Sequence, residues 1–188
     1  IHLYLAQTLK ELCIGELIQE DGLYDIKTRK LDYLKKIKRK TAILIAFACV
    51  AGSIVADASN ADIRRAFSYG YYLGMSYQII DDYLDFAGGA QNLGKEVGQD
   101  LMNGNITLPA LLAKEEKPEL FYNFTKDTSS EEKDEIINYI KNNDKVLSET
   151  LAVSRRYLEK AQESIDNIDS TVKTELTFIM NKLARREN

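Results

Sequence analysis

Three aspartates lie in an apolar segment that otherwise has the composition of a buried helix. Within residues 75–86 these are Asp81, Asp82 and Asp85. Carboxylates this close together repel one another and are costly to remove from water. If the segment is helical, Asp81 and Asp85 lie one above the other and Asp82 lies on the flank. The fold must then present a wall of oxygen donors on a single helical turn.

A divalent cation is the ligand that such a wall suits best. Mg²⁺ binds through one or two carboxylates and completes its shell with water and substrate phosphates. We therefore predict that Asp81, Asp82 and Asp85 bind Mg²⁺, with Gln78 one turn earlier able to hydrogen-bond beside the metal. The alternative is a solvated acidic face, and the apolar neighbours of the aspartates count against it.

The residues that follow the aspartates predict a loop that folds back. Glycines at positions 88, 89, 94 and 98 break the helix and allow a close turn. Lys95 can then reach over the carboxylates, where a cation would stabilise charge on a departing oxygen. Asp100 can cap a turn or bind that lysine. A new helix starts at Thr107, with Pro109 tolerated in its first turn.

The remaining sequence favours an all-α fold. The 188 residues contain 10 Gly and only 2 Pro, with long stretches of Ala, Leu, Ile, Lys and Glu. We predict helices over residues 3–19, 30–39, 41–57, 61–87, 107–115, 131–142, 145–167 and 171–185. We expect Ser59 to cap the start of the helix at 61–87. A capping box is expected at the start of the helix at 131–142.

Charge and hydropathy exclude several classes of function. A net charge of −4 without basic clusters among aromatic residues disfavours nucleic-acid binding. The apolar run at 42–56 spans about 22 Å as a helix, which is too short to cross a bilayer, so we expect a buried core helix. Cys13 and Cys49 lie in apolar helical patterns and are expected to be buried thiols rather than a disulfide.

Several motifs, in order, resemble the trans-isoprenyl diphosphate synthases. The run from Tyr77 to Asp85 resembles the second aspartate-rich motif of that family. The segments 94–101 and 107–109 resemble the elements that follow it. Upstream, Lys40-Thr41 resembles the pair that contacts diphosphate, and residues 15–19 resemble the helix before it. Within the family, the likeness is to the larger, catalytic subunit of bacterial heteromeric heptaprenyl diphosphate synthases.

The resemblance implies a fold and a chemistry. The fold is an all-α helical bundle of the isoprenoid (terpenoid) synthase type. The reaction is trans-prenyl transfer, in which isopentenyl diphosphate elongates an allylic diphosphate such as farnesyl diphosphate. The product is a long polyprenyl diphosphate, heptaprenyl on this likeness, for a menaquinone side chain. The enzyme would be cytoplasmic and dependent on Mg²⁺, working with a small regulatory subunit or as a homodimer.

The same resemblance implies the roles of individual residues. Asp81, Asp82, Lys40 and Lys95 are implied to be catalytic. The residues implied to bind substrate are Lys40, Thr41, Gln78 and Lys95. The metal ligands are Asp81, Asp82 and Asp85.

One departure from the family pattern is large, because no first aspartate-rich motif precedes residue 81. We therefore expect residues 1–188 to be one domain, the C-terminal part of a longer synthase, with a bundle incomplete at its N-terminus and inactive alone. Two alternatives remain. The segment from Gly94-Lys95 to Asp100-Leu101 counts against a related class I terpenoid synthase. The intact second motif counts against a non-catalytic helical subunit that stabilises a partner synthase.

Overall fold

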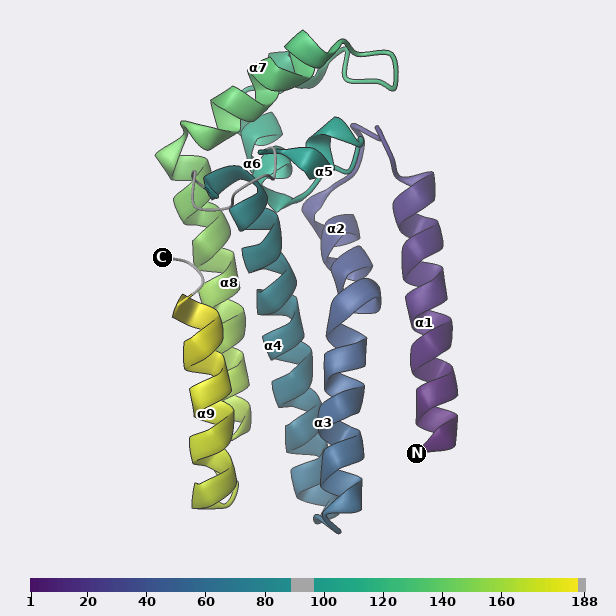
Figure 1. Ribbon diagram of the computed structural model, residues 1–188, viewed down its shortest axis with the longest axis vertical. Helices are drawn as coiled ribbons and strands as arrows, with labels where there is room; N and C mark the ends of the chain where they lie inside the picture. Colours follow the sequence, from purple (N-terminus) through teal and green to yellow (C-terminus); the bar gives the residue numbers. More distant parts are fainter. Residues whose placement is uncertain (89–96, 186–188) are drawn as a thin grey trace.

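The computed structural model describes residues 1–88 and 97–185, and every regular element within them is a helix (Figure 1). The elements are α1 (His2–Asp21), α2 (Lys30–Ile37), a π-helix (Lys38–Ala42), α3 (Ile43–Val55), α4 (Asn60–Ala87), α5 (Gln99–Met102), α6 (Leu108–Glu116), a 3₁₀ turn (Pro118–Phe121), α7 (Ser130–Lys141), α8 (Asp144–Ser164) and α9 (Ser170–Ala184). The predicted all-α class is confirmed.

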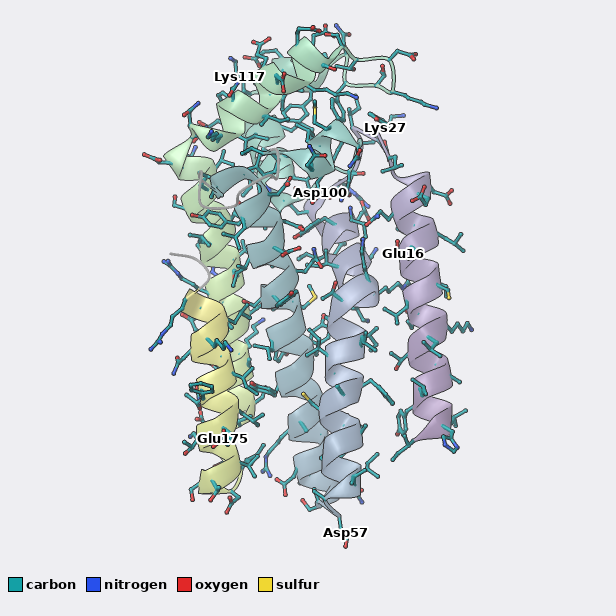
Figure 2. The ribbon with its side chains drawn as sticks, viewed as in Figure 1. Glu16, Lys27, Asp57, Asp100, Lys117 and Glu175 are labelled. Carbon is teal, nitrogen blue, oxygen red and sulfur yellow. The ribbon has the colours of Figure 1, made fainter. Side chains whose placement is uncertain are left out.

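The long helices stand side by side, with α4 in the middle (Figure 1). It packs most extensively against α3 and α8, and α1 stands at one edge of the bundle. The short helices α5 and α6 gather with α7 at the end of the bundle where α4 finishes. Asp100 lies at this end and Asp57 at the opposite end (Figure 2). The last turns of α4, which carry the aspartates, are therefore surrounded by the loops and short helices.

Local capping sets the boundaries that the sequence predicts. The Ser59 hydroxyl accepts the N–H of Asp62 at 3.1 Å at the start of α4. Ser129 and Glu132 form a complete capping box at the start of α7. Such caps satisfy N–H groups that a helix leaves unpaired in its first turn. The observed starts of both helices lie one residue from the predicted ones.

Two glycines let the backbone of α4 touch the backbones of α3 and of the π-helix. A Cβ atom added at Gly70 would lie 2.7 Å from the Cα of Ala46, and one at Gly74 would lie 2.6 Å from the Cα of Ala42. On another face of α4, the buried hydroxyls of Ser76 and Ser154 are 2.8 Å apart and join α4 to α8. The position of α4 is thus fixed by close contact on two sides.

Two expectations about burial are wrong in part. In α3, Ala46 and Val50 are buried, but Leu44 and Val55 are exposed, so only one face of this helix is in the core. Cys49 is half-buried, whereas Cys13 is exposed because α1 packs through the opposite face, at Gly15. Both cysteines are free thiols. Among the helices described, none is long and apolar enough to cross a membrane.

We predict that Gly74→Ala destabilises the protein by up to roughly 2 kcal/mol. Overpacking typically costs about 1–3 kcal/mol, and the gain in helix propensity of about 1 kcal/mol offsets part of it. Gly52 is the matched control, because a Cβ there meets no atom within 4 Å. Gly52→Ala should be neutral or stabilising in denaturant unfolding. Equal stability of the two variants would contradict the close contact.

Candidate active site

The predicted site residues that the structure describes come from two helical segments, which meet near the end of α4. The π-helix carries Lys40 and Thr41, and the last turns of α4 carry Gln78 and the aspartates. The short helix α5 closes over the end of α4. Lys95 lies outside the described residues, so its predicted place above the carboxylates remains a prediction.

The π-helix directs two consecutive side chains to different neighbours. Lys40 turns toward α1, where its Nζ donates to Gln19 Oε1 at 2.7 Å and lies 3.7 Å from Glu16 Oε1. Thr41 turns toward α4, and its hydroxyl donates to Gln78 Oε1 at 2.6 Å. Single π turns inside helices often occur at functional sites. Here the turn links α1 and α4 through adjacent residues.

Asp82 is the centre of a buried hydrogen-bonded chain. Gln78 Nε2 donates to Asp82 Oδ1 at 2.8 Å, and the Tyr33 hydroxyl donates to Asp82 Oδ2 at 2.6 Å. The Asp82 residue is only 3% exposed, and Tyr33 is fully buried. Burial raises the pKa of the Asp82 carboxyl to about 7, against the opposing effect of the two hydrogen bonds. Burial, followed by the charge of Asp82, raises the pKa of Tyr33 well above its usual range, so the phenol remains a donor.

Asp85 is held by backbone N–H groups. Its two oxygens accept the N–H groups of Gln99 and Asp100, each at 3.2 Å. The turn that presents these groups begins at Gly98, whose φ of 76° is in the left-handed region that favours glycine. Burial, then repulsion from Asp100, raises the pKa of Asp85 to about 6, and the two backbone hydrogen bonds oppose this rise.

The three aspartates therefore do not form the single wall that the sequence suggested. Asp81 is exposed, Asp85 is half-buried and Asp82 points into the protein toward α2. The reason is geometric, because consecutive helical residues differ by about 100° around the axis. In residues 1–88 and 97–185, no three His, Cys, Asp or Glu side chains are grouped to hold a metal ion. As hard oxygen donors on one helical turn, Asp81 and Asp85 nevertheless fit the part-shell that Mg²⁺ takes from protein.

Three residues of this site were missed in the sequence. Tyr33 binds Asp82, while Lys36 Nζ donates to Asn105 Oδ1 at 2.5 Å. Lys35 is exposed, whereas Lys36 is half-buried. The available signal was spacing, since positions 33, 36 and 40 follow one face of a helix. Asn105 had no such signal.

A cavity of about 270 Å³ adjoins this network, between the end of α1 and α2. Gln19, Tyr33 and Lys36 line it, together with Lys27 and Ile106. It therefore reaches the partner of Lys40 and the partner of Asp82. Tyr33 and Gln19 join the cavity to both halves of the site.

The comparison with known proteins identifies the family. The polyprenyl synthetase family model matches residues 1–140. This chain is a member of the polyprenyl synthetase family. It is 41% identical over 170 residues to heptaprenyl diphosphate synthase component 2 of Bacillus subtilis strain 168, which covers 89% of this chain and 48% of that protein. The chain thus spans about half the length of the curated relatives it matches.

Solved structures of the family share the fold. The heptaprenyl diphosphate synthase of Staphylococcus aureus is 35% identical with a TM-score of 0.93, covering all of this chain and 60% of that one. A polyprenyl synthase from Caulobacter crescentus CB15, solved with calcium and isoprenyl diphosphate, is 27% identical with a TM-score of 0.84. The match covers 98% of this chain and 57% of that one. The isoprenoid synthase bundle predicted from the motifs is confirmed.

We predict that Tyr33→Phe lowers the free energy of unfolding by about 1.5–3 kcal/mol. The substitution removes one donor from a buried carboxyl and leaves the acceptor unsatisfied. Tyr122→Phe is the control, since Tyr122 is 70% exposed. Chemical unfolding of both variants measures the difference. If Tyr33→Phe unfolds like Tyr122→Phe, the bond to Asp82 contributes nothing to stability.

Proposed function

We propose that this chain is part of a long-chain trans-prenyl diphosphate synthase that elongates an allylic diphosphate with isopentenyl diphosphate. The observation that carries the proposal is the contact between Thr41 and Gln78, which joins the Lys40-Thr41 pair to the aspartate-bearing helix. Motifs about 40 residues apart in sequence thereby form one site. Family membership and the names of the relatives support a heptaprenyl product.

In this proposal the diphosphate lies at the end of α4. Asp81 and Asp85 would hold Mg²⁺, which when bound supplies positive charge to the diphosphate. Lys40 and Lys95 would neutralise the leaving group. Gln78 would donate to it with its second amide hydrogen, and Thr41 would donate to it on exchanging its hydrogen bond to Gln78. The structure of the Caulobacter relative with calcium and isoprenyl diphosphate supports a cation and a diphosphate in this fold.

Asp82 has a different task in this proposal. Its side chain is buried and faces Tyr33, away from exposed Asp81, so we assign it to holding Gln78 and the last turns of α4 rather than to metal binding. Below it, Ile79 and Phe86 are fully buried and keep water from this turn. A site of this kind combines fixed dipoles at its mouth with apolar walls beneath.

The reaction itself requires charge separation without water. The allylic carbon–oxygen bond breaks, and its electron pair leaves on the diphosphate. The double bond of isopentenyl diphosphate then attacks the allylic cation to form the new carbon–carbon bond. A proton passes from the resulting carbon skeleton to an oxygen of the released diphosphate. Lys40 and Lys95 stabilise the charge that develops on that diphosphate.

We also propose that the enzyme works with a second subunit. The Bacillus subtilis relative is named as component 2 of its synthase. This supports a heteromeric enzyme in which the present chain belongs to the catalytic subunit. A homodimer is the alternative, and a purified full-length protein with and without its small subunit distinguishes the two.

We predict that Asp81→Ala lowers prenyl transfer by at least about 100-fold, since a metal contact supplies several kcal/mol of charge stabilisation. Incorporation of radiolabelled isopentenyl diphosphate measures this, with farnesyl diphosphate, Mg²⁺ and the full-length protein, alone and with its candidate partner. Asp134→Ala, an exposed carboxylate on α7, is the control and should keep full activity. No turnover by folded wild-type protein in any combination would refute the proposal and favour a non-catalytic subunit.

A further inference from the structure

A line of contacts leads from α2 to the last aspartate of α4. Lys36 Nζ donates to Asn105 Oδ1 at 2.5 Å, and Asn105 Nδ2 donates to Asp100 Oδ1 at 2.9 Å. The backbone of the same two residues is also joined, since the Asn105 N–H donates to the Asp100 carbonyl at 2.8 Å. Asp100 in turn gives its own N–H to Asp85 Oδ2. Asp100 lies at the end of the bundle where these segments meet (Figure 2).

Lys36 is half-buried, yet its ammonium group donates to a neutral amide rather than to a carboxylate. It is half-buried one turn before Lys40, and burial lowers the pKa of its ammonium group, against the effects of Asp82 and Asp100. Within the described residues it forms no salt bridge and gives its short hydrogen bond to neutral Asn105. Its neighbour Lys35 is exposed and lies 3.9 Å from Asp32 at the surface. Lys36 thus places a positive charge near Asp82 and Asp100.

The directions of the hydrogen bonds from Lys36 to Asn105 and from Asn105 to Asp100 explain how Lys36 can fix Asp100. When the Asn105 oxygen accepts from Lys36, its nitrogen faces the opposite side, where it donates to Asp100. The ammonium group therefore selects one orientation of the amide, and the amide fixes the Asp100 side chain. Fixing Asp100 also fixes the turn whose backbone N–H groups hold Asp85.

We propose that Lys36 is a positioning residue that sets the Asp85 carboxylate for binding Mg²⁺ and diphosphate, acting through Asn105 and Asp100. The inference rests on the proposed function only in that Asp85 faces the diphosphate. Groups that orient metal-binding carboxylates matter because removing them typically costs about 10–100-fold in metal affinity or activity.

The test uses four variants of the full-length protein. Lys36→Met removes the charge at similar length, and Lys36→Arg keeps it. Asn105→Asp is isosteric and still accepts from Lys36, but it cannot donate to Asp100. Lys35→Met is the matched control at the adjacent exposed lysine. The first readout is calorimetric binding of inorganic diphosphate across a Mg²⁺ series, and the second is the Mg²⁺ concentration for half-maximal prenyl transfer.

The proposal expects Lys36→Met and Asn105→Asp each to raise the required Mg²⁺ concentration by about tenfold. Lys36→Arg should retain most of the wild-type behaviour, and Lys35→Met all of it. An unchanged Mg²⁺ requirement in Lys36→Met would overturn the proposal, even if its melting temperature falls, because a merely structural tie would change only the folded fraction. A wild-type response in Asn105→Asp would overturn the route through Asn105.

The two readouts separate this inference from the proposed function. If the wild-type protein binds diphosphate with Mg²⁺ in a Lys36-dependent way but transfers no prenyl group, the proposed function fails and the positioning role stands. If prenyl transfer proceeds and Lys36→Met needs the same Mg²⁺ concentration as the wild-type protein, the proposed function stands and the positioning role fails.

Discussion

The buried carboxyl of Asp82 is the interaction on which the rest of the site depends. Removing a carboxylate from water is costly unless its oxygens find donors. Here Tyr33 donates to one oxygen and Gln78 to the other. Since Thr41 orients the amide of Gln78, a single buried group links α2, the π-helix and α4. The spacing of these helices must satisfy all three hydrogen bonds at once.

Close packing makes this arrangement possible. Gly70 brings α4 against the backbone of α3, and Gly74 brings it against Ala42 of the π-helix, next to Thr41. On the far side of the π-helix, a Cβ atom at Gly15 would lie 3.1 Å from the backbone nitrogen of Lys40. Glycines on two neighbouring helices thus set how near Lys40 and Thr41 come to their partners. The positions of the site residues at the end of α4 therefore depend on glycine contacts nearer the middle of the bundle.

Three adjacent carboxylates acquire three environments from these constraints. Asp82 is buried between side chains, Asp85 is bonded to the backbone of α5, and Asp81 is exposed. Repulsion among them is reduced because they point to different surroundings. Such a division leaves Asp81 and Asp85 as the oxygen donors nearest solvent. It also explains why this motif can sit in an otherwise apolar helix.

Local sequence signals predicted the helices better than the site. Ser59 and Ser129 cap their helices where short-range chemistry indicates, so the boundaries were nearly right. The five-residue π-helix and four-residue α5 are too short for a periodic pattern to reveal.

Hydrogen-bonded pairs far apart in the sequence were not predicted, for a different reason. Tyr33 and Asp82 are separated by 49 positions, and Lys36 and Asn105 by 69. The periodic pattern of one helix shows which of its faces is buried, but it does not identify the residue that a side chain contacts on another helix. Lys40 and Thr41 were assigned through resemblance to a family rather than through their own pattern.

A crystal structure of the full-length protein with Mg²⁺ and inorganic diphosphate tests the role of Asp82 most directly. We expect metal bound by Asp81 and Asp85, with the Asp82 oxygens still within hydrogen-bonding distance of Tyr33 Oη and Gln78 Nε2. A structure in which Asp82 coordinates the metal and has left Tyr33 would contradict the central role of this buried carboxyl.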